Sequence, residues 1–144
     1  MKHKRNDKRY IYMRDGGRCY FCSKQLLFKQ ISLDHYLPKS KGGPNDNFNL
    51  VCSCRRCNKY KKSSVPDDYK DVLMELFKKA VEDGQITSIG IKKKDLIMLT
   101  NEVYRLEAIG EYIVFQSSSN RFYVRNNKID KIVRVRTNIK NEEW

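Results

Sequence analysis

Apolar residues recur at helical spacing after position 66, and they alternate with polar residues beyond position 111. The first helical pattern begins after the start signal Ser64 to Asp68 and ends near Gly84. Its apolar positions are Tyr69, Val72, Leu73, Leu76, Phe77 and Ala80. A second, less regular pattern ends near Gly110 and uses Leu96, Leu99, Val103 and Leu106. We therefore predict two amphipathic helices whose apolar stripes pack in a core.

The alternating stretch predicts a three-stranded antiparallel meander with turns at 117–120 and 126–127. Its expected buried face carries Ile113, Phe115, Phe122, Val124, Val133 and Val135. The opposite face would carry Arg121, Tyr123, Arg125, Arg134 and Arg136. Arginines beside an aromatic residue on a small sheet suggest an accessory element that contacts DNA. An ordinary solvated sheet face explains the same pattern, and both interpretations stay open.

Two C-x-x-C pairs precede these elements, Cys19 with Cys22 and Cys54 with Cys57, and 31 residues separate the pairs. Each pair presents two thiolates on one side of a tight turn, and four such thiolates complete a tetrahedron around zinc. Disulfides are disfavoured because five cysteines are an odd number and no cleavable apolar signal segment precedes them. The sequence predicts a structural Zn²⁺ site, with Cys52 as a small buried side chain.

The residues between and after the pairs suit phosphodiester hydrolysis. His35 suits a general base, because a neutral imidazole is available near neutral pH. Asp34 and Asn58 offer hard oxygen ligands, which leave a hydrated Mg²⁺ or Mn²⁺ ion open positions for phosphate oxygens. Adjacent residues of a regular strand point to opposite faces, so the joint use of Asp34 and His35 requires a strand end or a bulge.

The same segment resembles the HNH family of nucleases over residues 5–62. The motifs that carry the resemblance are Arg14-Asp15-Gly16-Gly17-Arg18-Cys19, Leu33-Asp34-His35, Asn49-Leu50-Val51 and Cys54-Arg55-Arg56-Cys57-Asn58. The resemblance implies a two-stranded hairpin followed by a helix, pinned by zinc, with one divalent metal ion in the active site. The chain has Asn58 where the family name has a histidine. Asparagine is a common alternative there, so we expect a working HNN variant.

The resemblance also implies a role for each matching residue. Asp34 and Asn58 would bind the metal, His35 would activate water, and Asn49 would hold the loop and orient the His35 ring. Asn45 and Asn47 also lie near the middle position. We favour Asn49, because it immediately precedes an apolar pair as in the family pattern. The implied products are a 5′-phosphate and a 3′-hydroxyl.

Charge agrees with a DNA partner. The chain has 30 Lys and Arg against 17 Asp and Glu, a formal net charge of +13. Residues 1–62 hold 16 basic and 4 acidic residues (net +12), residues 63–110 hold 7 and 9 (net −2), and residues 111–144 hold 7 and 4 (net +3). The charge is thus concentrated on the segment that carries the candidate site. The candidate phosphate contacts there are Lys39, Lys41, Arg55, Arg56, Lys59, Lys61 and Lys62.

We therefore expect an α+β chain with a zinc-stapled ββα-metal core, C-terminal helices and a small antiparallel meander. The expected parts are a nuclease module at 1–62, a helical segment at 63–110 and a basic β-rich element at 111–144, together forming one compact unit. The leading function is a metal-dependent DNA endonuclease. The alternatives are a non-catalytic zinc module that binds nucleic acid, and an accessory subunit of a DNA-processing assembly.

Partners and location are expected only in outline. No segment approaches transmembrane length, and no basic helix has a strong apolar face, so no membrane partner is expected. A homodimer or a larger DNA-processing assembly stays open. Without a signal segment the expected location is cytoplasmic, and the small basic form suits a phage or mobile-element nuclease by analogy alone.

Overall fold

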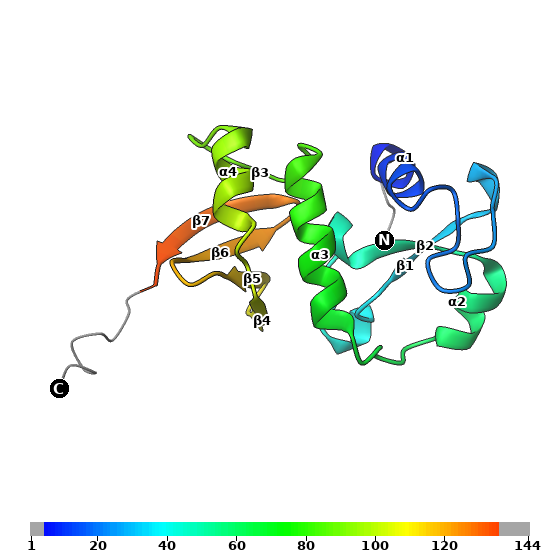
Figure 1. Ribbon diagram of the computed structural model, residues 1–144. Coiled ribbons are helices and arrows are strands. Elements are labelled where there is room, and N and C mark those ends of the chain that lie inside the picture. The colour runs from blue at the N-terminus through cyan, green and yellow to red at the C-terminus, as the bar shows by residue number, and fades with distance from the viewer. Residues whose placement is uncertain (1–4, 136–144) are drawn as a thin grey trace. The chain divides into compact units, whose positions relative to one another are not determined.

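The computed structural model describes residues 5–135 of the chain (Figure 1). The chain divides into two compact units, Met1–Leu76 and Phe77–Trp144. Helices and mostly antiparallel strands occur in both, so the predicted α+β class is confirmed. The expected division at residues 62 and 110 stays a prediction.

The first unit contains the predicted hairpin and helix. Strand β1 (Ser32–His35) pairs antiparallel with β2 (Leu50–Ser53), so that His35 lies opposite Leu50. Helix α2 (Arg55–Lys61) follows β2 directly, because Cys54 caps it by accepting a hydrogen bond from the backbone N–H of Cys57. Together β1, β2 and α2 form the ββα core that the sequence predicts.

Helix α1 (Arg5–Arg14) and three short 3₁₀ turns complete this unit. The turns are η1 (Phe28–Gln30), η2 (Lys39–Lys41) and η3 (Asn47–Asn49), and the last two belong to the loop that joins β1 to β2. The core that α1 shares with β2 is small. Its buried members are Ile11, Cys19, Leu26, Ile31, Leu50, Cys52 and Cys54. A bound structural metal ion would add to the stability of a core of this size.

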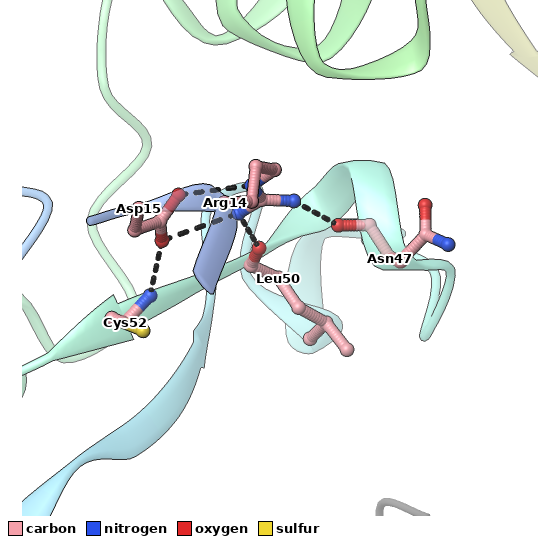
Figure 2. A network of polar contacts seen from close by, with 5 residues as sticks. All are labelled: Arg14, Asp15, Asn47, Leu50 and Cys52. Carbon is pink, nitrogen blue, oxygen red and sulfur yellow. Dashed lines mark hydrogen bonds and ion pairs between the residues drawn. The ribbon is translucent and has the colours of Figure 1, made fainter. Parts of the chain in front are cut away.

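A buried ion pair joins the end of α1 to β2 (Figure 2). The side chains of Arg14 and Asp15 are 2% and 3% exposed, and their closest N and O atoms are 2.9 Å apart. Arg14 also donates to the carbonyl oxygens of Asn47 (2.9 Å) and Leu50 (2.6 Å). Asp15 accepts the backbone N–H of Cys52 at 2.9 Å. Both charges are thus paired and further hydrogen-bonded, which is the condition for burying them.

Helix α3 (Tyr69–Glu82) confirms the first predicted helix and precedes Gly84, whose φ of +73° is the left-handed conformation that ends helices. The boundary between the two units falls inside it. In the second unit, the ring of Phe77 stacks on Phe115 with centroids 3.9 Å apart. Ala80 and Val81, which follow Phe77 on the same helix, are also buried.

The second unit holds a five-stranded sheet in the order β3-β7-β6-β5-β4. Its strands are β3 (Thr87–Ser88), β4 (Arg105–Ile109), β5 (Tyr112–Gln116), β6 (Asn120–Arg125) and β7 (Lys128–Arg134). The short β3 pairs parallel with β7, and every other pairing is antiparallel. The predicted meander is therefore present, with one more strand on each side.

The second predicted helix is wrong in its C-terminal half. Helix α4 (Lys93–Thr100) ends where the Thr100 hydroxyl bonds back to the carbonyl of Leu96, and residues 105–109 form β4. Leu106 is buried because it pairs with Phe115 across the sheet. Leu96 on α4 and Leu106 on β4 both face the core, so their helical spacing is a coincidence. Pairing with β5 makes residues 105–109 a strand, and local periodicity does not show that partner.

The predicted buried face is also wrong in the last strand. Val133 is 40% exposed, whereas Ile129 is 4% exposed. A bulge between Tyr123 and Val124 in the pairing with β7 shifts the register, so that Ile129 lies opposite Val124 and Ile132 lies opposite Phe122. One extra residue moves every later side chain to the other face, and sequence alternation alone does not reveal it.

Candidate active site and metal centres

The four paired cysteines converge as predicted. The Sγ atoms of Cys19, Cys22, Cys54 and Cys57 all lie within 4.8 Å of one another. Zinc–thiolate bonds of about 2.3 Å in a tetrahedron place sulfur atoms about 3.8 Å apart. The Sγ atoms of Cys22 and Cys54 are 3.8 Å apart. The cluster therefore fits the predicted structural zinc ion.

The turn that carries the second cysteine pair favours the thiolate form of Cys54. In the second turn, the backbone N–H of Cys57 donates to Cys54 Sγ, and this bond is the main cause that lowers the pKa of Cys54 to about 7. A thiol with a lowered pKa is readily present as the thiolate that binds metal. Cys52 behaves differently, since it is fully buried in the core and burial raises its pKa to about 12. The expected apolar role of Cys52 agrees with this placement.

Asp34 and His35 lie at the end of β1. Their joint use requires a strand end, because adjacent residues of a regular strand point to opposite faces. Asp34 Oδ2 is buried and accepts no hydrogen bond within the described residues 5–135. The nearest cation is Lys61, whose Nζ lies 4.0 Å from this oxygen. Burial raises the pKa of Asp34, and Lys61 opposes this only in part. A buried carboxylate oxygen without a hydrogen-bond donor fits a divalent cation, which would satisfy it directly.

Helix α2 carries two further candidate residues, Asn58 and Lys61, and Lys61 reaches this end of β1. Lys61 donates from Nζ to the carbonyl oxygen of His35 at 2.9 Å, and its side chain is only 7% exposed. Asn58 precedes Lys61 by three residues on the same helix, so both lie on one helix face. Asn58 itself is exposed, and its role as a metal ligand stays a prediction. Lys61, expected as a surface phosphate contact, is instead turned inward.

Asn49 holds the loop between the two strands. It is fully buried, its Oδ1 accepts the backbone N–H of Leu37, and its Nδ2 donates to the carbonyls of Leu37 (3.0 Å) and Pro44 (2.9 Å). Only glycine fits at position 43 beside these hydrogen bonds, because any Cβ there would overlap the carbonyl oxygen of Leu37. The Gly42-Gly43 turn seen in the sequence is thus needed to bring residues 44–46 back toward the hairpin.

Asn45 is a site residue that the sequence did not assign. Its Oδ1 lies 2.7 Å from Nε2 of the His35 ring. In the sequence, Asn45 is only a rival to Asn49 for the middle position of the motif. Its place two residues after the Gly42-Gly43 turn was the available signal, since such a turn reverses the chain. That Asn49 itself orients the ring stays a prediction.

The candidate phosphate contacts of the first unit fall into two groups besides Lys61. Lys39 and Lys41 are exposed on η2, in the loop that follows His35. Arg55, Arg56, Lys59 and Lys62 are exposed on α2 or directly after it. Neither group is neutralised by a salt bridge that the structure shows among residues 5–135.

The arginines of the sheet do not share one face. Arg121 is exposed and donates to the side chain of Gln116. Arg125 pairs with Glu111 (3.0 Å) and Asp130 (2.7 Å), so much of its charge is compensated. Arg134 lies opposite Asn120, the neighbour of Arg121, and therefore on the other face of the sheet. Arg136 lies outside the described residues.

Comparisons with known proteins find similarity over part of this chain. A model of the HNH endonuclease family matches residues 19–74. The CRISPR-associated endonuclease Cas9 of Corynebacterium diphtheriae is 29% identical over 96 residues, which cover 62% of this chain and 9% of that protein. The Type II-C Cas9 enzyme of Actinomyces naeslundii superposes with a TM-score of 0.43 at 20% identity, over 70% of this chain and 12% of that structure.

The chain spans only about a tenth of the length of these relatives. Among the described residues, no helix combines the length and apolar character needed to cross a membrane. The matched segment contains both cysteine pairs, Asp34, His35, Asn49 and Asn58. Residues 19–74 of this chain therefore match the HNH endonuclease family, and Asn58 as the last signature position stays a prediction.

Proposed function

We propose that this chain is a metal-dependent DNA endonuclease that hydrolyses phosphodiester bonds and leaves a 5′-phosphate and a 3′-hydroxyl. The observation that carries the proposal is the pair formed by the buried, unsatisfied Asp34 Oδ2 and the adjacent His35 at the end of β1. A non-catalytic zinc module would not need a buried carboxylate oxygen beside an imidazole.

His35 acts as the general base in this proposal. Its ring takes a proton from a water molecule, the resulting hydroxide attacks phosphorus, and the bond from phosphorus to the 3′ oxygen breaks. The leaving 3′ oxygen takes a proton from solvent. Asn45 holds the ring at Nε2, and Asn49 holds the loop from which Asn45 projects.

Asp34 and Asn58 would hold the catalytic Mg²⁺ or Mn²⁺ ion. Bound there, the ion would offset the negative charge that develops on the phosphate and on the leaving oxygen. Two hard oxygen ligands suit this ion, since magnesium keeps several water positions that a substrate oxygen can take. Lys61 fixes the carbonyl of His35 and partly offsets the Asp34 charge, which keeps both residues in place.

The DNA contacts of the proposal come chiefly from the first unit. The exposed basic residues on η2 follow His35 in the sequence, those on α2 lie around Asn58, and the chain is strongly basic overall. Their attraction for phosphate is independent of base sequence. Contacts from Arg121, Arg125, Arg134 and Arg136 remain part of the proposal, with Arg121 the strongest candidate, since Arg125 already pairs with two acidic residues.

Cleavage of supercoiled plasmid by the purified, zinc-loaded chain tests the proposal. We expect nicking or linearisation with added Mg²⁺ or Mn²⁺, none with EDTA, and a rate at least about 100-fold lower for His35→Ala. Asn101→Ala, an exposed change in the second unit, is the matched control. Binding of DNA without cleavage under any metal would favour the non-catalytic zinc module. Activity that survives in His35→Ala would indicate a contaminating nuclease.

A further inference from the structure

A groove of about 1360 Å³ lies in the first unit, and its wall includes Cys22, Cys54 and Cys57 of the cysteine cluster together with residues of α2. Five basic residues line it, and no acidic residue does so within the described chain. They are Lys24, Arg55, Arg56, Lys59 and Lys62. Such a concentration of one charge on a concave wall attracts a polyanion.

The zinc centre alone does not explain these charges. A zinc ion with four thiolates carries a net charge of −2, so nearby cations stabilise it. Five positive charges minus two leave an excess of three in the groove. This excess is available for phosphate groups of a ligand.

An exposed aromatic ring lines the same groove. Tyr60 is 77% exposed, and the guanidinium carbon of Arg56 lies 5.9 Å from its ring centre. A ring has two faces, so stacking of Arg56 on one is compatible with stacking of a base on the other. Basic grooves with exposed aromatic rings are typical of sites that bind single strands, because the bases of a duplex are already stacked on each other.

Helix α2 has two functional sides. Lys61 points to the carbonyl of His35 and is 7% exposed, whereas Arg56, Lys59 and Tyr60 line the groove. The groove is therefore distinct from the candidate catalytic pair, yet the same helix carries both.

We propose that this groove binds a single-stranded segment of nucleic acid, with its phosphates on the basic residues and one base stacked on Tyr60. Its use, which rests on the proposed function, is to hold a strand next to the site of cleavage. The binding itself does not require that the chain cuts DNA.

Binding is measured on the full, zinc-loaded chain with His35→Ala, which prevents cleavage during the assay. The probes are a fluorescent oligothymidine of 20 nucleotides and a fluorescent duplex of equal length, followed by anisotropy between 50 and 200 mM salt. Tyr60→Ser should weaken single-strand binding by about 5-fold or more. It should change duplex binding by less than about 2-fold. Tyr104→Ser, 58% exposed in the second unit, is the aromatic control.

A triple variant tests the phosphate contacts. The changes Lys24→Gln, Arg56→Gln and Lys59→Gln should make the slope of log affinity against log salt less steep by about 2 for the single strand. Lys92→Gln, Lys93→Gln and Lys94→Gln remove equal charge from exposed positions at the start of α4 and should leave that slope within about 0.5. Equal zinc content in all variants excludes loss of the metal centre as the cause.

The proposal is overturned if both triple variants change the slope equally, or if Tyr60→Ser binds the single strand as tightly as its parent. Equal losses for single strand and duplex would overturn the assignment to single strands. The plasmid assay separates the two proposals. If the plasmid is not cleaved but the groove variants still weaken single-strand binding, the nuclease proposal is wrong. If the plasmid is cleaved but the groove variants bind the single strand normally, the groove proposal is wrong.

Discussion

The His35 ring is held at Nε2 by the side-chain oxygen of Asn45. With that oxygen as acceptor, Nε2 carries the proton of the neutral imidazole, and in the proposed mechanism Nδ1 is the nitrogen that would take a proton from water. A base whose tautomer and angle are set by a partner keeps its geometry through the reaction. Asn45 is therefore a positioning residue in the proposed mechanism.

Removing this oxygen should impair the chemical step. We expect Asn45→Ala to lower kcat by about 10- to 100-fold with little change in KM, because the ring loses its orientation while the DNA contacts remain. Asn45→Asp keeps an oxygen acceptor and should retain most of kcat. Steady-state cleavage of a labelled duplex gives both constants. A normal kcat for Asn45→Ala, or equal losses for both variants, would show that the hydrogen bond does not set the ring.

Asp34, His35 and Asn58 could be proposed as site residues from the sequence because they sit at fixed offsets within short motifs. Asn45 was not, because its contact with His35 depends on how the loop of residues 36–49 folds back. That path is set by Asn49 and by the close approach at Gly43, which are tertiary contacts. Local propensity predicts the turn but not the side chain that it delivers.

The Arg14–Asp15 pair fastens α1 to β2 and to the turn η3 that leads into it (Figure 2). Breaking it from one side leaves a buried carboxylate without its guanidinium. We expect Arg14→Leu to lower the free energy of unfolding of the first unit by about 3 to 5 kcal/mol. Arg9→Leu, an exposed change in the same helix, should cost less than about 0.5 kcal/mol.

Urea denaturation of the zinc-loaded chain, followed by the fluorescence of its tyrosines and by circular dichroism, measures both variants. A loss below about 1 kcal/mol for Arg14→Leu would mean that the pair is solvated in solution. The Arg14-Asp15 sequence entered the family resemblance without a role. In the structure, the Arg14–Asp15 pair ties α1, which precedes the first cysteine pair, to β2, which leads to the second cysteine pair.

The register of β7 gives another test. Ile129 is 4% exposed opposite Val124, whereas Val133 is 40% exposed. Truncating a buried isoleucine removes buried area and leaves a cavity. We expect Ile129→Ala to lower the stability of the second unit by about 2 to 4 kcal/mol, and Val133→Ala by less than about 1 kcal/mol. Thermal denaturation measures both losses. A larger loss for Val133→Ala than for Ile129→Ala would mean that Val133 is the buried residue, as the sequence alternation predicts.

The division into two compact units has a consequence for metal removal. The first unit has a small core and the cysteine cluster, while the second has its own core around Phe77, Phe115 and Phe122. Binding of a structural zinc ion contributes directly to folding of the part that it joins. Loss of zinc should therefore unfold the first unit and leave the second folded.

Hydrogen exchange read by mass spectrometry measures this directly. After chelation, amides of β1 and β2 should lose protection by at least about 100-fold, while those of β5 and β6 keep it. Restored zinc should restore the protection of the hairpin. The fully buried Cys52 reports the same event, since it should react with iodoacetamide only after chelation. Equal loss of protection in both units would show that the chain unfolds as one cooperative body.

The sequence by itself determined which residues are candidates for the chemistry of this protein. Cysteine spacing, the Asp-His pair and the two asparagines are local patterns, and they predicted the ββα core, the cysteine cluster and the family. Helix α3 was likewise predicted, because its apolar period and its start and stop signals are all local.

Tertiary structure decided what depends on distant partners. Strand β4 replaced half of a predicted helix because β5 pairs with it, and a single bulge chose Ile129 over Val133 for the core. Burial left Asp34 Oδ2 without a hydrogen bond from any residue of the described part of the chain, turned Lys61 inward and brought Asn45 to His35. Pairing, register and burial are properties of segments far apart in the chain, and no local pattern of residues encodes them.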